Sequence, residues 1–207
     1  MVCVAYPQGF KVEDIIPGND NDKRYLLRVS NESSSAKGIA TIIMMNPSKA
    51  TKSCSDPTVN KVLKFFGANL DKQIREIIIL NLFPYYETDS KKLAACVKRN
   101  NSNELGENLN EFKNCIKVSN LIVLAWGDVP KGFSAKLHNK YVKSVINIID
   151  EVMKQNSLYV FKDNRFNIEH IVTKKHRPRH PNRIALNDLQ KVQRYSSYRD
   201  LLKLKFS

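Results

Sequence analysis

The sequence has no long apolar run, no nucleotide-binding glycine motif and few acidic residues. A membrane helix needs about 18 consecutive apolar residues, and nothing in the 207 residues approaches that. The first ten residues, MVCVAYPQGF, have too short an apolar stretch and no basic start, so we expect no signal peptide. A membrane is therefore not an expected partner.

Signatures of several enzyme classes are also missing. There is no P-loop, no G-x-G-x-x-G and no G-x-S-x-G nucleophile elbow. The cysteines, Cys3, Cys54, Cys96 and Cys115, are scattered without C-x-x-C spacing, which argues against a zinc site or a disulfide framework. We expect reduced thiols in a cytoplasmic protein that holds no metal and no cofactor.

The charge balance is strongly basic. The 34 Lys and Arg residues outnumber the 20 Asp and Glu residues, which gives a net charge of +14. Such an excess favours nucleic acid first and an anionic membrane surface second, although a solubilising coat of lysines is the alternative. Residues 173–183, TKKHRPRHPNR, contain two histidines, two prolines and five cations without an acid.

Hydrophobic patterning predicts strands that alternate with helices. Short, mainly apolar segments predict buried core strands at 39–45, 76–83, 120–127 and 168–172. A peripheral strand is predicted at 24–30 and an extra one at 157–161. Helices are predicted at 58–70 with Thr58 as N-cap, at 89–101, 103–117 and 134–155, and from 185–197 into the tail. This order predicts one α/β domain over 1–207, a three-layer α/β/α sandwich around a mostly parallel four-stranded sheet.

Polar residues follow the predicted core strands. In open α/β sheets, ligands bind beyond the carboxyl ends of the strands. Asn46 follows the first core strand, Asn81 lies near the end of the second, Gly127 closes the third, and His176 and His180 follow the fourth. A buried amide without partners costs about 1–3 kcal/mol. Asn81 is therefore either a satisfied structural residue or a binding group, and its donors and acceptor suit the Watson–Crick edge of a base.

These strand ends resemble the motifs of the uracil-DNA glycosylase superfamily over residues 39–183. The matching segments, in chain order, are MMNPS at 44–48, IIILN at 77–81, LIVLAWG at 121–127 and HP at 180–181. The resemblance implies a glycosylase-like α/β/α domain with a base pocket. It assigns Asn46 to positioning of the attacking water, Asn81 to base recognition and His180 to support of the leaving base.

Several positions depart from that pattern. His180-Pro181 continues as Asn182-Arg183 instead of the serine and wedge residue of the superfamily, and 55–59 lacks its stacking aromatic. Phe65, Phe66 or Tyr85 could replace that aromatic. The early C-x-x-C of the iron–sulfur branches is missing, so no cluster is expected. More narrowly, the chain resembles a small family with N-P-S, D-P-T, N-L-F, A-W-G and R-H-P segments that is often found on bacterial mobile elements.

Further roles follow from the chemistry that the resemblance implies. Asparagine cannot act as a base, so Asp56 could supply the missing carboxylate. Phosphate contacts are expected from the basic loop, namely Lys174, Lys175, Arg177, Arg179 and Arg183, and from Ser48 and Lys49. His170 is expected to be a structural residue of its strand, Trp126 is expected in the core, and His138 is expected at the surface of its helix.

Three functional hypotheses remain open. The first is a protein that binds DNA, single- or double-stranded, and recognises a uracil-like base with weak or absent glycosylase activity. The second is an active N-glycosylase for uracil or another modified base. The third is a non-enzymatic binder of nucleic acid or of a partner protein on a mobile element, including an RNA-processing or decoy protein.

Overall fold

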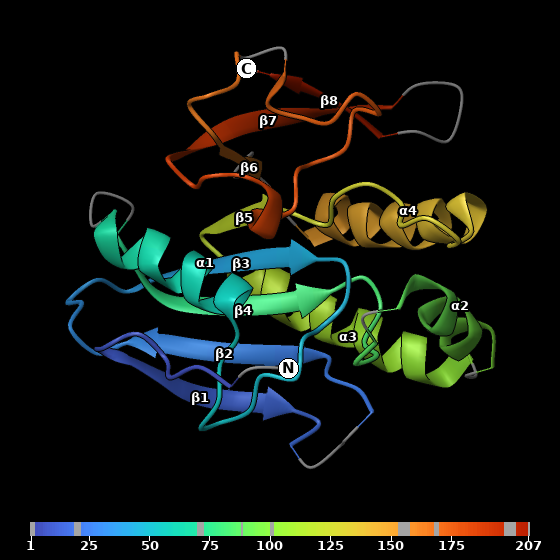
Figure 1. Ribbon diagram of the computed structural model, residues 1–207. Helices are drawn as coiled ribbons and strands as arrows, with labels where there is room; N and C mark the ends of the chain where they lie inside the picture. The colour runs from blue at the N-terminus through green and yellow to red at the C-terminus, as the bar shows by residue number, and fades with distance from the viewer. Residues whose placement is uncertain are drawn as a thin grey trace.

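The fold is a wide mixed sheet with helices on both faces (Figure 1). The computed structural model describes residues 3–18, 22–69, 73–87, 89–99, 102–152, 158–167, 170–196 and 202–206. The strand order is β1-β2-β4-β3-β5-β6-β7-β8. The chain is therefore of the α/β class, as the alternation of elements predicts.

Four parallel strands form the centre of the sheet. They are β3 (Gly38–Met44), β4 (Ile74–Asn81), β5 (Leu121–Leu124) and β6 (Leu158–Lys162). β3 pairs in parallel with β4 and β5, and β5 pairs in parallel with β6. Side chains on both faces of these strands are buried, which explains why their sequences are apolar runs without alternation.

Antiparallel strands extend the sheet on both sides, so the prediction of a four-stranded, mostly parallel sheet is wrong. β1 (Phe10–Ile16) pairs with β2 (Leu26–Asn31), and β2 pairs with β4. At the other side β7 (Asp188–Ser196) pairs with β6, and β8 (Leu202–Phe206) pairs with β7. These strands supply the hydrogen-bond partners that the outer parallel strands would otherwise lack.

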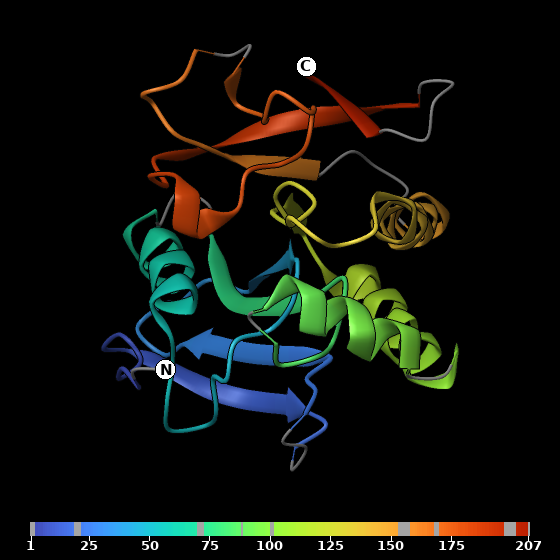
Figure 2. The ribbon, with the colours of Figure 1, turned by 45° about the vertical axis from the view of Figure 1, so that its right-hand side comes forward.

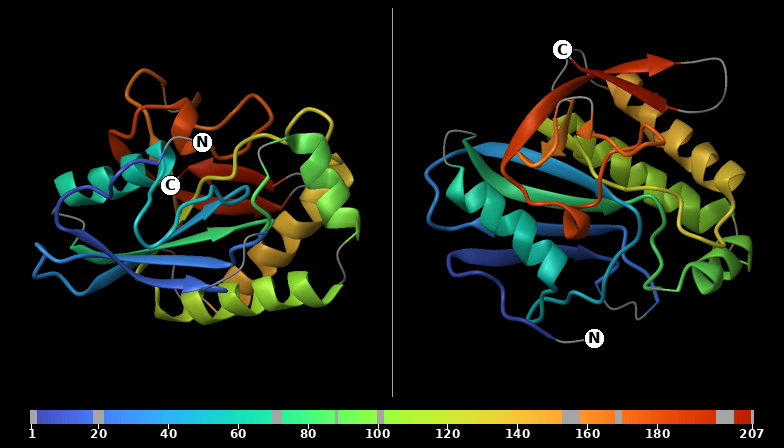
Figure 3. Two further views of the ribbon diagram at one scale, coloured as in Figure 1. Left: turned by 60° about the horizontal axis from the view of Figure 1, so that its bottom comes forward. Right: turned by 45° about the horizontal axis from the view of Figure 1, so that its top comes forward.

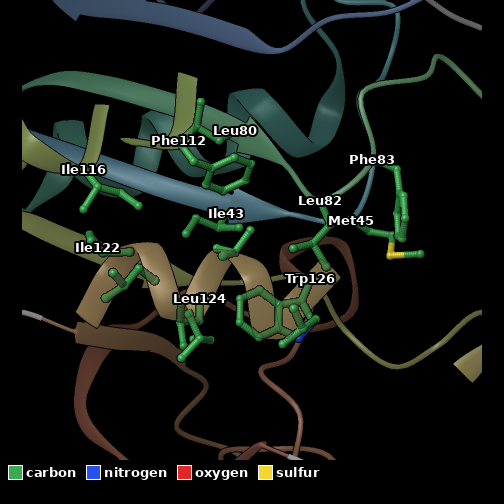
Figure 4. Packing of buried hydrophobic residues seen from close by; sticks show 14 of the residues in the cluster. Ile43, Met45, Leu80, Leu82, Phe83, Phe112, Ile116, Ile122, Leu124 and Trp126 are labelled. Carbon is green, nitrogen blue, oxygen red and sulfur yellow. The ribbon is translucent and has the colours of Figure 1, made fainter. Parts of the chain in front are cut away.

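The helices divide between the two faces of the sheet (Figure 2). The apolar side of α1 (Pro57–Ala68) packs with Ile42, Ile77 and Ile79 on one face. On the other face, α2 (Ser90–Arg99), α3 (Ser102–Val118) and α4 (Ala135–Val152) bury a second core. That core includes Ile43, Phe112, Leu124 and Trp126 (Figure 4), so the expectation that Trp126 is a core residue is confirmed.

Two predicted elements near the carboxyl end are wrong. The fourth parallel strand is β6, not 168–172. Of that segment, the described residues 170–172 form one isolated bridge from Val172 to Pro178, although Ile171 and Val172 are buried. The helix predicted from 185 is strand β7, because the open edge of β6 pairs with it. Residues 197–201 lie outside the described part of the chain.

The start of α1 and the cysteines also differ from expectation. Asp56, not Thr58, is the N-cap of α1. Cys3 is joined to Cys54 by a disulfide with a Cα separation of 5.4 Å, so the prediction of reduced thiols is wrong for this pair, whereas Cys96 and Cys115 are free. An antiparallel bridge from Val4 to Ser55 brings the segments around Cys3 and Cys54 together. A local sequence pattern cannot predict such a long-range contact. No described helix is long and apolar enough to span a membrane.

Candidate functional site

Loops from distant parts of the chain meet at the carboxyl ends of the parallel strands, on the side of α1 (Figure 3). Met44 at the end of β3 lies opposite Asn81 at the end of β4. The basic loop, residues 173–183, reaches the end of β5, where the Gly127 N–H donates to the Pro178 carbonyl at 2.9 Å. Gly127 has a φ of 77°, and a Cβ there would lie 3.2 Å from the His180 Cβ. The positive φ and the short distance to His180 both favour glycine at this position.

Asn81 is the least satisfied polar side chain at this edge. It is fully buried, and neither its Oδ1 nor its Nδ2 has a hydrogen-bond partner among the described residues. Strand alternation places it on the same face as Ile77 and Ile79, beneath α1. Its backbone carbonyl accepts a 3.0 Å bond from the Asn108 Nδ2, which fixes the main chain. The main chain is thus held in place, while both polar atoms of the buried amide have no partner among the described residues.

Asn46 and Asp56 are both held by other parts of the protein. The Asn46 Nδ2 donates to the Glu87 carbonyl at 2.6 Å, which ties the loop after β3 to the loop after β4. The Asp56 Oδ1 accepts the N–H groups of Thr58 at 2.7 Å and Val59 at 3.1 Å, and its Oδ2 accepts the Ser48 hydroxyl. Asp56 therefore engages both oxygens in holding the start of a helix and its neighbouring loop, an arrangement that suits a structural group better than a base. The Ser48 hydroxyl is likewise bonded to Asp56.

His180 is held at the start of a short 3-10 helix, η3 (Pro181–Arg183). Its Nδ1 lies 2.8 Å from the Asn182 Oδ1 and 3.4 Å from the Asn182 backbone nitrogen. Lys61 of α1 donates to the carbonyls of Pro181 and Ile184, which fastens η3 to the helix. Burial lowers the pKa of His180, although the hydrogen bond with Asn182 opposes the shift, and this favours the neutral ring. With Nδ1 engaged by Asn182, Nε2 is the ring atom available to a ligand.

The candidate stacking aromatics are engaged elsewhere. The Phe65 ring packs edge-on against Phe66 and Phe161, with centroid distances of 5.1 and 5.4 Å. Tyr85 lies in the core on the opposite face, and its hydroxyl donates to the Glu104 Oε2 at 3.0 Å. Phe65 is therefore packed against other aromatic rings, and Tyr85 lies on the opposite face of the sheet from the Asn81 side chain.

The cations of the basic loop fall into two groups. Lys174, Lys175 and Arg183 are exposed, as is Lys49 in the loop after β3. Arg179 is half-buried, donates to the His170 carbonyl at 3.0 Å and stacks on Phe166. The exposed side chains can approach phosphates, whereas Arg179 also secures the loop.

Arg177 does not lie where the sequence prediction puts it. It is buried, and its guanidinium bonds to the His138 Nδ1 at 2.9 Å and the Asn139 Oδ1 at 2.6 Å. A phosphate contact from Arg177 is therefore inconsistent with the structure. His138 is fully buried, so the expectation that it lies at the surface is wrong. Its side chain is in phase with Val142, Val145 and Ile149 on the buried face of α4, and that spacing is visible in the sequence.

Sequence reasoning missed Arg24. Its side chain is fully buried, its Nη1 donates to the Ala50 carbonyl at 3.2 Å, and its Nε and Nη2 have no partner among the described residues. In the sequence Arg24 is a single cation at the start of a predicted peripheral strand, and no pattern in the neighbouring residues predicts that it is buried.

The chain has an open α/β fold, a class in which ligands bind beyond the carboxyl ends of the parallel strands. More narrowly, the chain belongs to a family described as protein of unknown function (DUF1643), whose model matches residues 24–182. The matched range contains Arg24, Asn46, Asn81 and His180. No curated protein and no solved structure matches the chain.

Proposed function

We propose that this protein binds nucleic acid and recognises a uracil-like base with Asn81, in a fold of the uracil-DNA glycosylase type. The observation that carries the proposal is the fully buried Asn81 amide without a hydrogen-bond partner among the described residues. A buried amide in that state costs about 1–3 kcal/mol. The imide edge of uracil, with an N–H between two carbonyls, satisfies both the donor and the acceptor of an asparagine.

The wider arrangement supports the same conclusion. Asn46, Asn81, Gly127 and His180 follow one another along the chain in the order of the superfamily motifs. The exposed cations Lys174, Lys175 and Arg183 lie in the loop that carries His180, where they would contact phosphates as a base is drawn into the site. The net charge of +14 favours an anionic polymer as the partner.

We further propose that glycosylase activity on ordinary uracil-DNA is weak or absent. Asparagine cannot remove a proton from water, and both oxygens of Asp56 already accept hydrogen bonds. One observation favours the second candidate, an active N-glycosylase. In the tautomer whose Nδ1 accepts from the Asn182 N–H, the His180 Nε2 carries the proton, which suits a donor to the departing base.

Binding measurements test the main proposal. Fluorescence anisotropy would compare oligonucleotides with and without uracil, single- and double-stranded, and an RNA of the same sequence. We expect a preference for uracil-DNA of about tenfold, which corresponds to roughly 1.4 kcal/mol. Asn81→Ala should remove this preference and leave uracil-independent binding intact. Asn114→Ala is the matched control, because Asn114 is an exposed asparagine of α3, which packs on the opposite face of the sheet from α1.

The outcomes separate the hypotheses. A folded Asn81→Ala variant that keeps the uracil preference contradicts the proposal. If the wild type and Asn81→Ala bind RNA equally well, the RNA-processing alternative is favoured. Alkaline strand scission, with His180→Ala as the blank, tests the second candidate: uracil-dependent cleavage that requires His180 establishes a glycosylase, and its absence leaves base recognition as the activity.

A further inference from the structure

Arg24 lies at the same edge of the sheet as Asn81. β2 runs antiparallel to β4 with Leu26 opposite Leu80, so the residue two positions before Leu26 lies just beyond the end of β4. The Arg24 N–H donates to the Pro84 carbonyl at 2.7 Å, which fixes its backbone beside a residue three positions after Asn81. The side chain then extends under the loop after β3, where it bonds to Ala50.

The guanidinium of Arg24 is buried without a counter-charge bound to it. It has no ion pair with a carboxylate among the described residues, and its contact with Ala50 uses only Nη1. An aromatic neighbour is Tyr86, whose ring centroid lies 5.9 Å from the Arg24 Cζ. Removing a cation from water costs several kcal/mol unless its donors and its charge are satisfied. Burial lowers the pKa of Arg24, and Tyr86 and Asp56 oppose that shift, but the Asp56 oxygens are held by Ser48 and the start of α1.

The unpartnered atoms form a complete binding edge. Nε and Nη2 lie on one side of a guanidinium and donate two parallel bonds to the two oxygens of one anion. Arg165 uses that same edge on Asp163, with Nε–Oδ1 and Nη2–Oδ2 distances of 3.0 and 2.6 Å. In Arg24 the corresponding pair of donors has no acceptor among the described residues.

We propose that Arg24 binds a phosphate group of the nucleotide whose base is held by Asn81. This inference rests on the proposed function and adds the phosphate to the base as a recognised part of the ligand. A uracil nucleotide carries an imide edge that can pair with Asn81 and a phosphate whose two oxygens can accept from Arg24. The phosphate is either the monoester of a free nucleotide or a diester of a nucleic-acid strand, since both present two oxygens to the same edge.

Calorimetric titration of the full chain tests the inference with four probes. They are deoxyuridine, dUMP, inorganic phosphate and a short single-stranded oligonucleotide with one uracil. We expect dUMP to bind about tenfold more tightly than deoxyuridine, because a bidentate phosphate contact adds at least that factor. Arg24→Met should bring dUMP to the level of deoxyuridine and leave deoxyuridine unchanged. Arg24→Lys should also lose most of the difference, since an ammonium keeps the charge but lacks the planar edge.

The matched control is Arg75→Met. Arg75 is an exposed arginine near the amino end of β4, so the same loss of charge occurs at the far edge of the sheet. It should leave the difference between dUMP and deoxyuridine intact. A general electrostatic effect would reduce that difference in both variants and overturn the inference.

Urea unfolding without ligand distinguishes binding from a structural role. Replacing an unpaired buried cation by an apolar side chain of similar length should leave the midpoint unchanged or raise it. A folded Arg24→Met variant with a lower midpoint and an undiminished preference for dUMP overturns the inference and makes Arg24 a support for the loop after β3.

The two proposals fail in different ways. Equal binding of dUMP and deoxyuridine by the wild type overturns the phosphate contact while the base site at Asn81 stands. If deoxyuridine does not bind but inorganic phosphate binds the wild type and not Arg24→Met, base recognition fails and the anion site stands. If Arg24→Met weakens binding of the oligonucleotide but not of dUMP, the phosphate is a diester of a nucleic-acid strand. If Arg24→Met weakens binding of dUMP as well, the phosphate of a free nucleotide is sufficient. Binding of none of the four probes overturns the inference.

Discussion

At the scale of single residues, the buried polar groups divide into those that the protein satisfies and those that it does not. Asp163 accepts from Arg165 and from the Ala185 N–H, and Arg165 holds the pKa of Asp163 well below its usual range. Asp56 is satisfied in a similar way by the start of α1. Asn81 and Arg24 are equally buried but keep available donors. Other buried side chains, such as Asn108 and His138, lack a partner for one atom only, whereas Asn81 and Arg24 each lack partners for two, which is why we propose these two as binding groups.

His138 makes the stability of the fold depend on pH. Burial, with a smaller contribution from Arg177, lowers its pKa from 6.5 to about 3. The unfolded chain therefore takes up a proton below about pH 6.5 that the folded chain cannot accept. Stability from this group is complete above pH 6.5 and should fall toward pH 3 with a limiting slope of about 1.4 kcal/mol per pH unit. Urea unfolding at several pH values measures this slope.

His138→Asn isolates that contribution. The Asn oxygen can replace the His138 Nδ1 as acceptor for Arg177, but it does not titrate. The dependence of the unfolding free energy on pH should therefore decrease by about 1.4 kcal/mol per pH unit, which corresponds to one proton. His176→Asn, at an exposed histidine of the basic loop, should leave it unchanged. If His138→Asn keeps the wild-type slope, another group governs the acid transition.

The site residues that sequence reasoning located are those beside a strand end or in the basic loop. Asn46 and Asn81 lie at the ends of β3 and β4, and His180 lies in the loop that reaches the end of β5, so the rule that ligands bind beyond parallel strands selects them. Arg24 follows no such rule, because its burial depends on a loop 26 residues further along the chain. Asp56 was located, but its role as a cap only becomes visible once the start of α1 is known.

At the scale of elements, the parallel strands were predictable and their neighbours were not. Residues 39–45 and 77–80 are short apolar segments, and such segments are typical of strands covered on both faces. The segment 168–172 is also rich in Ile and Val but contains Glu169 and His170. Its described residues 171 and 172 are buried outside the sheet, and β6 is the fourth parallel strand. β7 was predicted as a helix because its strand pairing comes from β6, a contact that a local pattern does not contain.

The basic loop is the element that we expect to contact phosphates, through its exposed cations only. Replacing Lys174, Lys175 and Arg183 together by Ala should weaken binding to every DNA sequence. It should also reduce the slope of log K against log salt by about 0.7–0.9 for each phosphate that the variant no longer neutralises. Anisotropy titrations at several salt concentrations give both values.

A triple replacement of Lys136, Lys140 and Lys143, exposed on α4, removes the same charge from another surface and is the control. If both triple variants bind DNA equally weakly, the overall charge of +14 governs binding and the loop has no special role. Arg177→Ala is unsuitable for this test, since it would leave the buried His138 and Asn139 without their partner.

At the scale of the whole molecule, the disulfide ties the amino-terminal segment to the loop that covers Arg24. Cys3 and Cys54 are separated by 51 residues, a span that includes β1, β2 and β3. Closing a loop of this length restricts the unfolded chain and stabilises the folded one by about 2–4 kcal/mol. Cys54→Ser should therefore lower the free energy of unfolding by that amount in the absence of reductant, as measured by urea titration.

Adding a reductant distinguishes the effect of the Cys3–Cys54 disulfide from the effect of replacing the Cys54 side chain. With dithiothreitol present, the wild type should unfold at the same urea concentration as Cys54→Ser, whereas Cys96→Ser, at a free cysteine, should behave as the wild type in both conditions. If the urea midpoint of the wild type is the same with and without dithiothreitol, the disulfide contributes no stability. Ala50 and Asn46 lie in the same loop as Cys54, and Ala50 holds the Arg24 guanidinium. Reduction of the disulfide should therefore weaken the binding of dUMP more than that of deoxyuridine, because the loop lies against the phosphate half of the proposed site.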